Sequence, residues 1–280
     1  NVDSDISNEI DSIVKSKGKE YTSVFMSWIS TKKGTDQKKA SALLKQTEIL
    51  EKYVKKLPIV IFDRYRSMTT EEYNWLRKFK VTFFEPAIHP RDGFKYLPNW
   101  TKIKTIEDIE LNDTKRSVNL GYIGSLADKT KSFDKYYVKP KLSHDIKVSY
   151  YSKNVPDKDY LSLGIASCPL TFNDIEFTVV IGNAYDYATG HLDQYYFEAL
   201  NNNCIPLLPM ENRYYSSLPY TINTETWYDM YSYMYDGIYI GMIKDIYDRI
   251  KKYYPEMNIK FTADVIKKYL VSPYSAIEDI

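Results

Sequence analysis

Two segments of this 280-residue chain combine residue types that can hold a nucleotide diphosphate. In the first, the apolar run Gly121-Tyr-Ile ends in Gly124-Ser125. A strand that ends in Gly-Ser leaves backbone N–H groups at the start of the following helix, where they and the helix dipole attract phosphate. Lys129 and Lys131 follow closely and could neutralise its charge. Taken alone, the Gly-Ser could be a plain strand-to-helix turn and the lysines simply solvated.

The second segment, Tyr195–Leu208, has the pattern of a helix followed by a strand. Glu198 lies on the helix, and the strand begins with Cys-Ile-Pro. This order is the usual late motif of nucleotide-sugar transferases with two Rossmann-like lobes, in which the glutamate accepts hydrogen bonds from the ribose hydroxyls. Glu198 by itself could be a surface glutamate. The two segments occur in the required order, about seventy residues apart, and together they predict a nucleotide-sugar site in the C-terminal half.

A candidate general base follows the apolar strand Leu57–Phe62, in the sequence Asp63-Arg64-Tyr65-Arg66. Open α/β sheets place reactive groups at the carboxyl ends of their parallel strands, so Asp63 is expected to face a cleft and to accept a proton. In the alternative interpretation, Asp63 caps the next turn or pairs with Arg64 or Arg66. These two arginines belong to a basic cluster that could bind an acceptor, with Arg77, Lys78, Lys80 and Arg91.

The order of apolar runs and helical patterns predicts the fold class. Strand, helix and strand with short links form a βαβ unit, whose sheet is parallel. We expect an α/β protein with two Rossmann-like lobes and a cleft between them: an N-terminal, acceptor-side lobe over 1–114 and a C-terminal, donor-binding lobe over 115–280, with tail helices packing back. The predicted strands are 21–29, 57–62, 81–84, 118–123, 146–151, 177–181 and 205–208, and the predicted helices are 4–16, 37–55, 69–79, 128–138, 193–202, 238–253 and 262–270.

Composition narrows the remaining function classes. The chain carries 38 basic and 37 acidic side chains, a net charge of +1, so whole-protein charge does not indicate a nucleic-acid binder, although a local basic face would suffice. The polar start and the lack of a long apolar run predict a soluble protein without a membrane partner, and two cysteines fit the cytoplasm. The three histidines share no zinc-ligand spacing, and a divalent metal is not indicated. His191, just before the Glu198 helix, could face a sugar.

The order of segments resembles the DNA β-glucosyltransferases of T-even bacteriophages. The matching segments are Glu20–Met26, Ala40–Tyr53, Ile59–Arg66, Gly121–Ser125, Ile146–Tyr151, Val179–Gly182 and Tyr195–Glu198. The resemblance implies a two-lobed fold of the GT-B type. It also implies inverting transfer of glucose from UDP-glucose, the donor substrate, to a hydroxymethylated base in duplex phage DNA, the acceptor.

The resemblance implies residue roles as well. Asp63 matches the family's catalytic base, Gly124 and Ser125 match the turn under the diphosphate, Lys131 stands where the family has a phosphate-binding arginine, and Glu198 matches the ribose ligand. The family has two more such arginines, where this chain has Ala127 and Tyr195. Lysines, backbone groups or a metal must therefore meet the diphosphate charge. The family's first strand, loop, helix and strand have no counterpart before Glu20, so the N-terminal lobe is expected to be smaller or the chain to be a fragment.

Three functions remain in competition on sequence alone. The first is the inverting transferase acting on phage DNA. The second is a two-lobed transferase with the same donor chemistry that acts on a surface polysaccharide or glycoprotein. The third is a non-catalytic binding module that retains a nucleotide fold.

Overall fold

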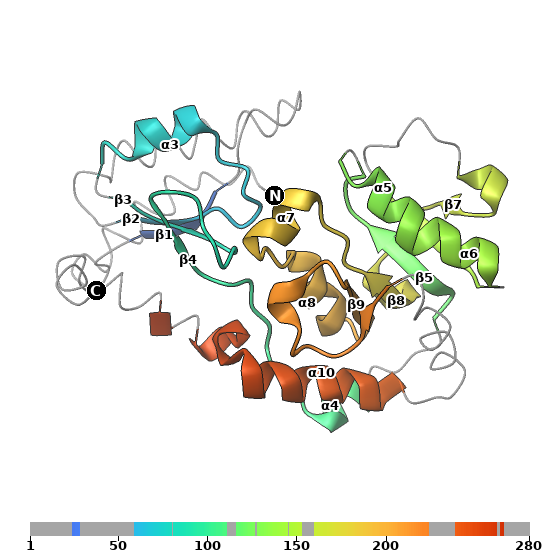
Figure 1. Cartoon of the computed structure of the whole chain (residues 1–280). Helices are drawn as coiled ribbons and strands as arrows, with labels where there is room; N and C mark the ends of the chain where they lie inside the picture. The colour runs from blue at the N-terminus through green and yellow to red at the C-terminus, as the bar shows by residue number, and fades with distance from the viewer. Residues whose placement is uncertain are drawn as a thin grey trace, which may run out of the picture. The chain divides into compact units, whose positions relative to one another are not determined.

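The computed structural model describes most of the chain, in two compact units (Figure 1). The first unit holds the described residues up to Leu97 together with 264 and 265, and the second runs from Pro98 to Phe261. The expected helices 4–16 and 37–55 lie outside the described residues, and 262–270 lies almost wholly outside them. The described ranges are 24–28, 59–79, 81–110, 116–126, 128–144, 146–152, 160–223, 239–261 and 264–265.

The units divide at Leu97, earlier than the expected boundary at residue 114. The segment after Leu97 makes its contacts within the second unit: Thr101 pairs with Asn258 in an isolated bridge, and its Oγ1 lies 2.6 Å from Oδ1 of Asn201. A helix, α4 (Ile106–Glu110), follows in a stretch that the sequence pattern predicts to be irregular.

The first unit is built on a parallel sheet with strand order β1-β2-β3-β4. The strands are β1 (Val24–Ser27), β2 (Ile59–Phe62), β3 (Val81–Glu85) and β4 (Phe94–Tyr96), and α3 (Thr70–Leu76) connects β2 to β3. A capping box between Thr69 and Glu72 begins α3, because each side chain bonds the other's backbone N–H. The hydrophobic core of this unit contains the buried side chains of Trp28, Ile59, Ile61, Met68, Leu76, Phe83 and Phe94. The three predicted strands are present in this sheet, whereas β4 was not predicted.

The second unit contains a six-stranded parallel sheet of order β10-β9-β8-β5-β6-β7 among the described residues. The strands are β5 (Val118–Ile123), β6 (Val148–Tyr151), β7 (Ala166–Ser167), β8 (Ile175–Val179), β9 (Ile205–Pro209) and β10 (Thr221–Ile222). The chain builds outward from β5 to β7 and then returns to place β8 on the other side of β5. This is the strand order of the dinucleotide-binding fold, and its switch point lies between β5 and β8. The predicted class, α/β with two parallel sheets, is therefore confirmed.

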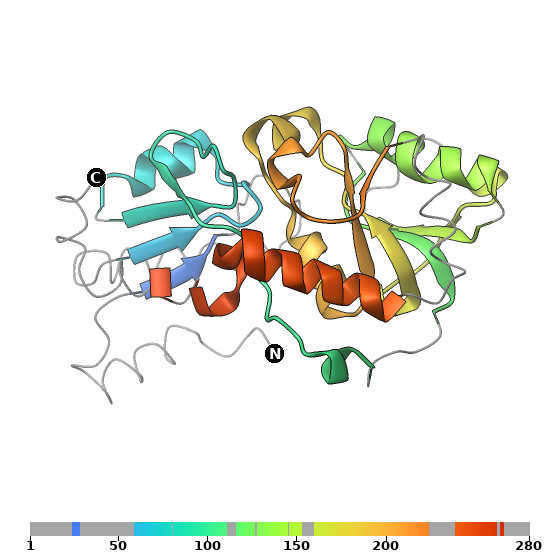
Figure 2. The ribbon, with the colours of Figure 1, turned by 60° about the horizontal axis from the view of Figure 1, so that its bottom comes forward.

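Helices position the loops at the switch point (Figures 1 and 2). After β5 come α5 (Thr130–Phe133), a π-helical segment (Asp134–Val138) and α6 (Lys139–Ser143). After β8 come α7 (Ala184–Thr189) and α8 (Gln194–Asn201). Stacked rings of Phe133 and Tyr137, 4.8 Å apart, anchor the first run in the core. In α10 (Tyr239–Tyr253), the buried residues Met242, Ile243, Ile246, Tyr247 and Ile250 recur at helical spacing, and their face packs within the second unit.

Candidate functional site

The turn that follows β5 has a backbone that favours glycine. Gly124 has φ +146°, and its N–H donates to the carbonyl of Tyr151 at 3.1 Å. A Cβ at Gly124 would lie 3.1 Å from Oη of Tyr122 and 3.2 Å from Cε2 of Tyr195. The Tyr122 hydroxyl also donates to the Ser125 carbonyl at 2.6 Å. Two tyrosines therefore hold the turn in one conformation, with Ser125 exposed at its tip.

The loop after β8, Val180–Asn183, lies beside the segment after β5. Ser132 Oγ of α5 donates to the Gly182 carbonyl at 3.2 Å, and Asn183 Nδ2 donates to Asp128 Oδ2 at 2.8 Å. Asn183 also begins α7 through a capping box with Asp186. The two loops are about fifty residues apart in sequence and meet at the switch point, where open α/β sheets bind their ligands.

The start of α8 is the third component of this site. Asp193 caps the helix by accepting the N–H of Tyr195 at 3.1 Å, and Lys129 Nζ lies 3.4 Å from its Oδ2. Lys129, predicted from the sequence to meet a phosphate, is therefore partly neutralised by Asp193. Lys131 is exposed and makes no ion pair with any described residue. Because Lys129 is paired with Asp193, Lys131 is the better placed of the two lysines to neutralise a bound anion.

Glu198 lies one turn further along α8. Tyr195 packs against Phe172, with ring centres 6.1 Å apart, and approaches Gly124, and residues three apart on a helix share a face. The half-buried Glu198 therefore lies on the face of α8 that is turned to the end of β5. The structure brings Gly124, Ser125, Lys129 and α8 together at one edge of the sheet. That these residues bind a donor stays a prediction.

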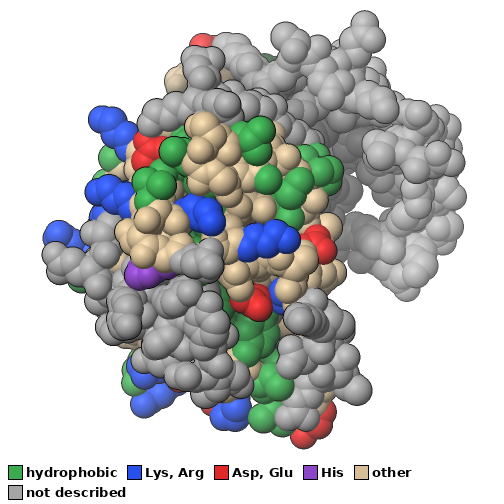
Figure 3. Space-filling view, turned by 90° about the vertical axis from the view of Figure 1, so that its right-hand side faces the viewer, with side chains coloured by type: hydrophobic (Ala, Val, Ile, Leu, Met, Phe, Trp, Pro, Cys, Tyr) green, Lys and Arg blue, Asp and Glu red, His purple; other side chains and the backbone are tan. Residues whose placement is uncertain are grey.

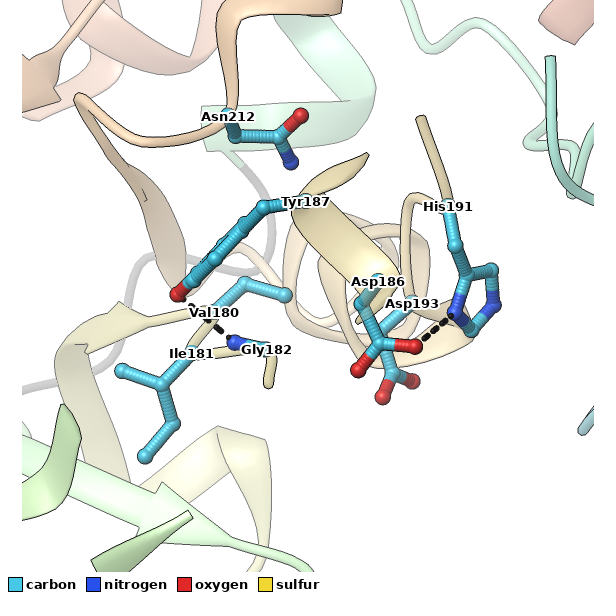
Figure 4. Close-up of a pocket in the computed structure, with 8 residues that line it drawn as sticks. All are labelled: Val180, Ile181, Gly182, Asp186, Tyr187, His191, Asp193 and Asn212. Atoms are coloured by element: carbon cyan, nitrogen blue, oxygen red, sulfur yellow. Dashed lines mark hydrogen bonds and ion pairs between the residues drawn. The ribbon is translucent and has the colours of Figure 1, made fainter. Parts of the chain in front are cut away.

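A small pocket opens beside the β8 loop (Figure 4). Its lining is Val180–Gly182, Asp186 and Tyr187 of α7, His191, Asp193 and Asn212. Nδ1 of His191 lies 3.1 Å from Oδ1 of Asp186, and both side chains are largely buried. Burial raises the pKa of Asp186, but the hydrogen bond and charge of His191 and the N–H of Asn183 outweigh it, so the pKa falls below its ordinary value. Asp186 is therefore ionised at neutral pH.

Sequence reasoning missed part of this pocket. Asp186 and Asp193 carry readable signals, since Asn183-Ala-Tyr-Asp186 matches a capping box and Asp193 precedes a helix. Asn212 carries no such signal, because it reaches the pocket from the turn after β9. His191 lines the pocket, and that it faces a sugar stays a prediction.

Asp63, in the first unit, lies in a buried network of charges. Its side chain is 0% exposed. Oδ1 accepts the N–H of Ser67 at 2.8 Å, and Oδ2 accepts the N–H of Met68 at 2.8 Å and Nη2 of Arg91 at 2.6 Å. Arg91 also contacts Glu85, with Nε 2.7 Å from Oε2. This geometry favours the structural alternative, in which Asp63 caps the turn, with Arg91 as partner in place of Arg64 or Arg66. Its role as a base stays a prediction.

The basic cluster of the first unit is largely committed to internal contacts. The Arg66 side chain is 5% exposed and lies 3.5 Å from Glu85, and the guanidinium of Arg64 lies 5.8 Å from the centre of the Phe62 ring. Arg66 is therefore poorly placed for the acceptor role expected of it. Arg77 and Lys78, at the end of α3, are exposed, and Lys80 lies outside the described residues.

Within the described ranges, no group of three or more His, Cys, Asp or Glu side chains is arranged to hold a metal ion. None of the helices described there is long and apolar enough to span a bilayer.

Comparison with known proteins gives distant structural similarities. A glycosyltransferase from Rickettsia africae is 9% identical, with 86% of this chain and 83% of that one covered and a TM-score of 0.46. A UDP-forming α,α-trehalose-phosphate synthase from Burkholderia xenovorans is 12% identical, with 85% and 80% covered and a TM-score of 0.46. A sucrose-phosphate synthase from Thermosynechococcus elongatus is 7% identical, with 90% and 68% covered and a TM-score of 0.41. No protein-family model and no curated protein matches the chain.

Proposed function

We propose that this chain is a glycosyltransferase that takes its sugar from a nucleotide-sugar donor, and that the second unit binds the donor. One observation carries the proposal: the Gly124-Ser125 turn, the β8 loop and the start of α8 meet at the switch point of a dinucleotide-type sheet. At such a point the backbone can approach a phosphate closely. By its resemblance to the phage enzymes, the donor is UDP-glucose.

Each part of the donor has a proposed position. The diphosphate lies at the Gly124-Ser125 turn, with Lys131 supplying positive charge and Lys129 moving between Asp193 and the phosphate. Glu198 accepts hydrogen bonds from the ribose hydroxyls. By the resemblance, Tyr195 stands where the family has an arginine, and its ring lies against Gly124 of the turn. The diphosphate of this chain is therefore held by backbone and lysine, which are weaker partners than an arginine fork.

The proposed reaction is an inverting displacement. A hydroxyl of the acceptor attacks the anomeric carbon, its proton passes to a base, and the sugar–phosphate bond breaks with UDP as the leaving group. Positive charge and N–H groups near the diphosphate stabilise the negative charge that develops there. Asp63 is the predicted base, and it could act only if its pair with Arg91 opened. The proposed acceptor is a hydroxymethylated base in phage DNA, and a surface polysaccharide or glycoprotein is the second candidate.

Glu198→Ala tests the donor site. We expect the variant to bind UDP about 1–3 kcal/mol more weakly, because the ribose hydroxyls lose a charged acceptor. Isothermal titration calorimetry with UDP measures the change. Glu176→Ala is the matched control, since this glutamate lies at the amino end of β8 and contacts Asn119. Equal UDP affinity of the Glu198 variant and the wild type would refute the ribose assignment.

Arg77→Glu combined with Lys78→Glu tests the DNA acceptor. We expect weaker retention on duplex DNA and a shallower dependence on salt, by about 0.9 for each phosphate that the variant no longer neutralises, with unchanged UDP binding. On the face shown in Figure 3, the coloured Lys and Arg side chains lie in separate places among hydrophobic, acidic and uncharged groups, so that face presents no continuous basic surface among the described residues. If the wild type shows no DNA binding even at low salt, the polysaccharide or glycoprotein acceptor is favoured.

A further inference from the structure

The pocket beside the β8 loop is rich in hydrogen-bond acceptors. The side chains of Asp186, Asp193 and Asn212 all line it (Figure 4). Each carboxylate already has two partners. Asp186 accepts the N–H of Asn183 at 3.0 Å and lies 3.1 Å from His191, and Asp193 accepts the N–H of Tyr195 at 3.1 Å and lies 3.4 Å from Lys129. A carboxylate oxygen pair can accept about four hydrogen bonds, so both retain acceptor capacity.

Asn212 has no structural task that explains its burial. It is 5% exposed, and its Oδ1 makes no hydrogen bond within the described part of the protein. It precedes the 3-10 turn Arg213–Tyr215 without capping it through its side chain. Nε2 of His191 is likewise buried and makes no hydrogen bond within the described part of the protein, and the His191 side chain is 10% exposed. Buried polar groups are normally paired, so these two atoms of one lining leave hydrogen-bond positions that a bound ligand could complete.

The chemistry of the lining selects the kind of ligand. A diphosphate would face two carboxylates here, and like charges at close range repel. A second cation is disfavoured as well, because Lys129 already lies beside Asp193. A neutral ligand with several hydroxyl groups fits, since each hydroxyl can donate to a carboxylate or to the Asn212 oxygen.

We propose that this pocket is the sugar subsite of the donor, in which Asp186, Asp193 and Asn212 accept hydrogen bonds from the hydroxyls of the transferred hexose. The inference rests on the proposed function and adds which residues hold the sugar. The empty space in the pocket and over its open mouth is about 210 Å³, which includes space open to solvent, so the pocket is too small for a complete nucleotide sugar. It therefore holds one part of the donor, and the nucleotide and diphosphate lie at the neighbouring turn.

Asn212→Ala tests the proposal, because its side-chain oxygen makes no hydrogen bond to the described part of the protein that the substitution would remove. Calorimetry with UDP and with UDP-glucose is compared for the variant and the wild type. We expect UDP affinity to stay within about twofold and UDP-glucose affinity to fall roughly tenfold, as one buried hydrogen bond to the sugar is removed. Thermal unfolding of the ligand-free variant is expected at the same temperature as the wild type or slightly above it.

Asn119→Ala is the matched control at the opposite end of the sheet. Its side chain bonds Glu176 and the N–H of Lys147, so this variant loses stability but keeps the wild-type ratio of the two affinities. If the wild type binds neither compound, the proposed function fails and this inference with it. If the wild type binds both and Asn212→Ala leaves both affinities unchanged, or lowers both equally, the sugar subsite is refuted while the nucleotide site stands.

Discussion

The variant Asp63→Asn is expected to lower the free energy of unfolding by about 3 kcal/mol or more. The amide nitrogen must replace either Oδ1, which accepts the N–H of Ser67, or Oδ2, which accepts the N–H of Met68 and Nη2 of Arg91. Both arrangements place donor against donor. Arg91 keeps Glu85 as a partner, which holds the loss near the lower end for a broken buried pair. Urea denaturation of both proteins measures the change.

Arg91→Met separates the structural role of Asp63 from a catalytic one. This variant breaks the same ion pair from the other side, leaves the carboxylate in place and also removes Arg91 from Glu85. A structural Asp63 therefore predicts that Arg91→Met loses at least as much stability as Asp63→Asn, and that activity falls together with stability in both variants. A catalytic Asp63 predicts a different pattern: Asp63→Asn would unfold at the wild-type urea concentration and bind UDP normally, while transfer falls by about 10²–10⁴-fold. That pattern would overturn the structural interpretation.

The variant Gly124→Ala is expected to weaken UDP binding by tenfold or more and to destabilise the fold by about 1–3 kcal/mol. At φ +146° an L side chain is strained, and the new Cβ would press on Tyr122 and Tyr195 at 3.1 and 3.2 Å. Relief of these close approaches moves the Gly124-Ser125 turn, and with it the N–H groups proposed to meet the diphosphate. Calorimetry measures the affinity and denaturation the stability.

Gly121→Ala is the control for this substitution, three residues earlier and within β5. Its Cβ would lie 2.5 Å from Cδ1 of Ile175, so the core must shift and the protein loses stability, by about 1–3 kcal/mol for overpacking. The folded fraction of this variant is expected to bind UDP as the wild type does. Wild-type UDP affinity in Gly124→Ala would show that the turn does not hold the donor.

Local features of the sequence determined the fold class and several elements. Apolar runs between polar turns marked β2, β3, β5, β6, β8 and β9, because buried parallel strands exclude polar side chains on both faces. The helix-to-strand pattern marked α8, and the pair Gly124-Ser125 marked the turn after β5. Each of these signals is contained in about ten consecutive residues, so it can be recognised without knowledge of the tertiary contacts.

Only the tertiary structure decided which groups meet. The return of the chain across β5 placed the β8 loop beside the β5 turn, and no local pattern encodes that crossover. Asp63 found its partner in Arg91, 28 residues away, because the ends of β2 and β3 are neighbours in the sheet. Asn212 follows β9 and Asp186 follows β8. Both residues line the same pocket because these two strands are paired in the sheet. Hydrogen bonding and burial depend on such neighbours, which the residue type and its spacing along the chain do not specify.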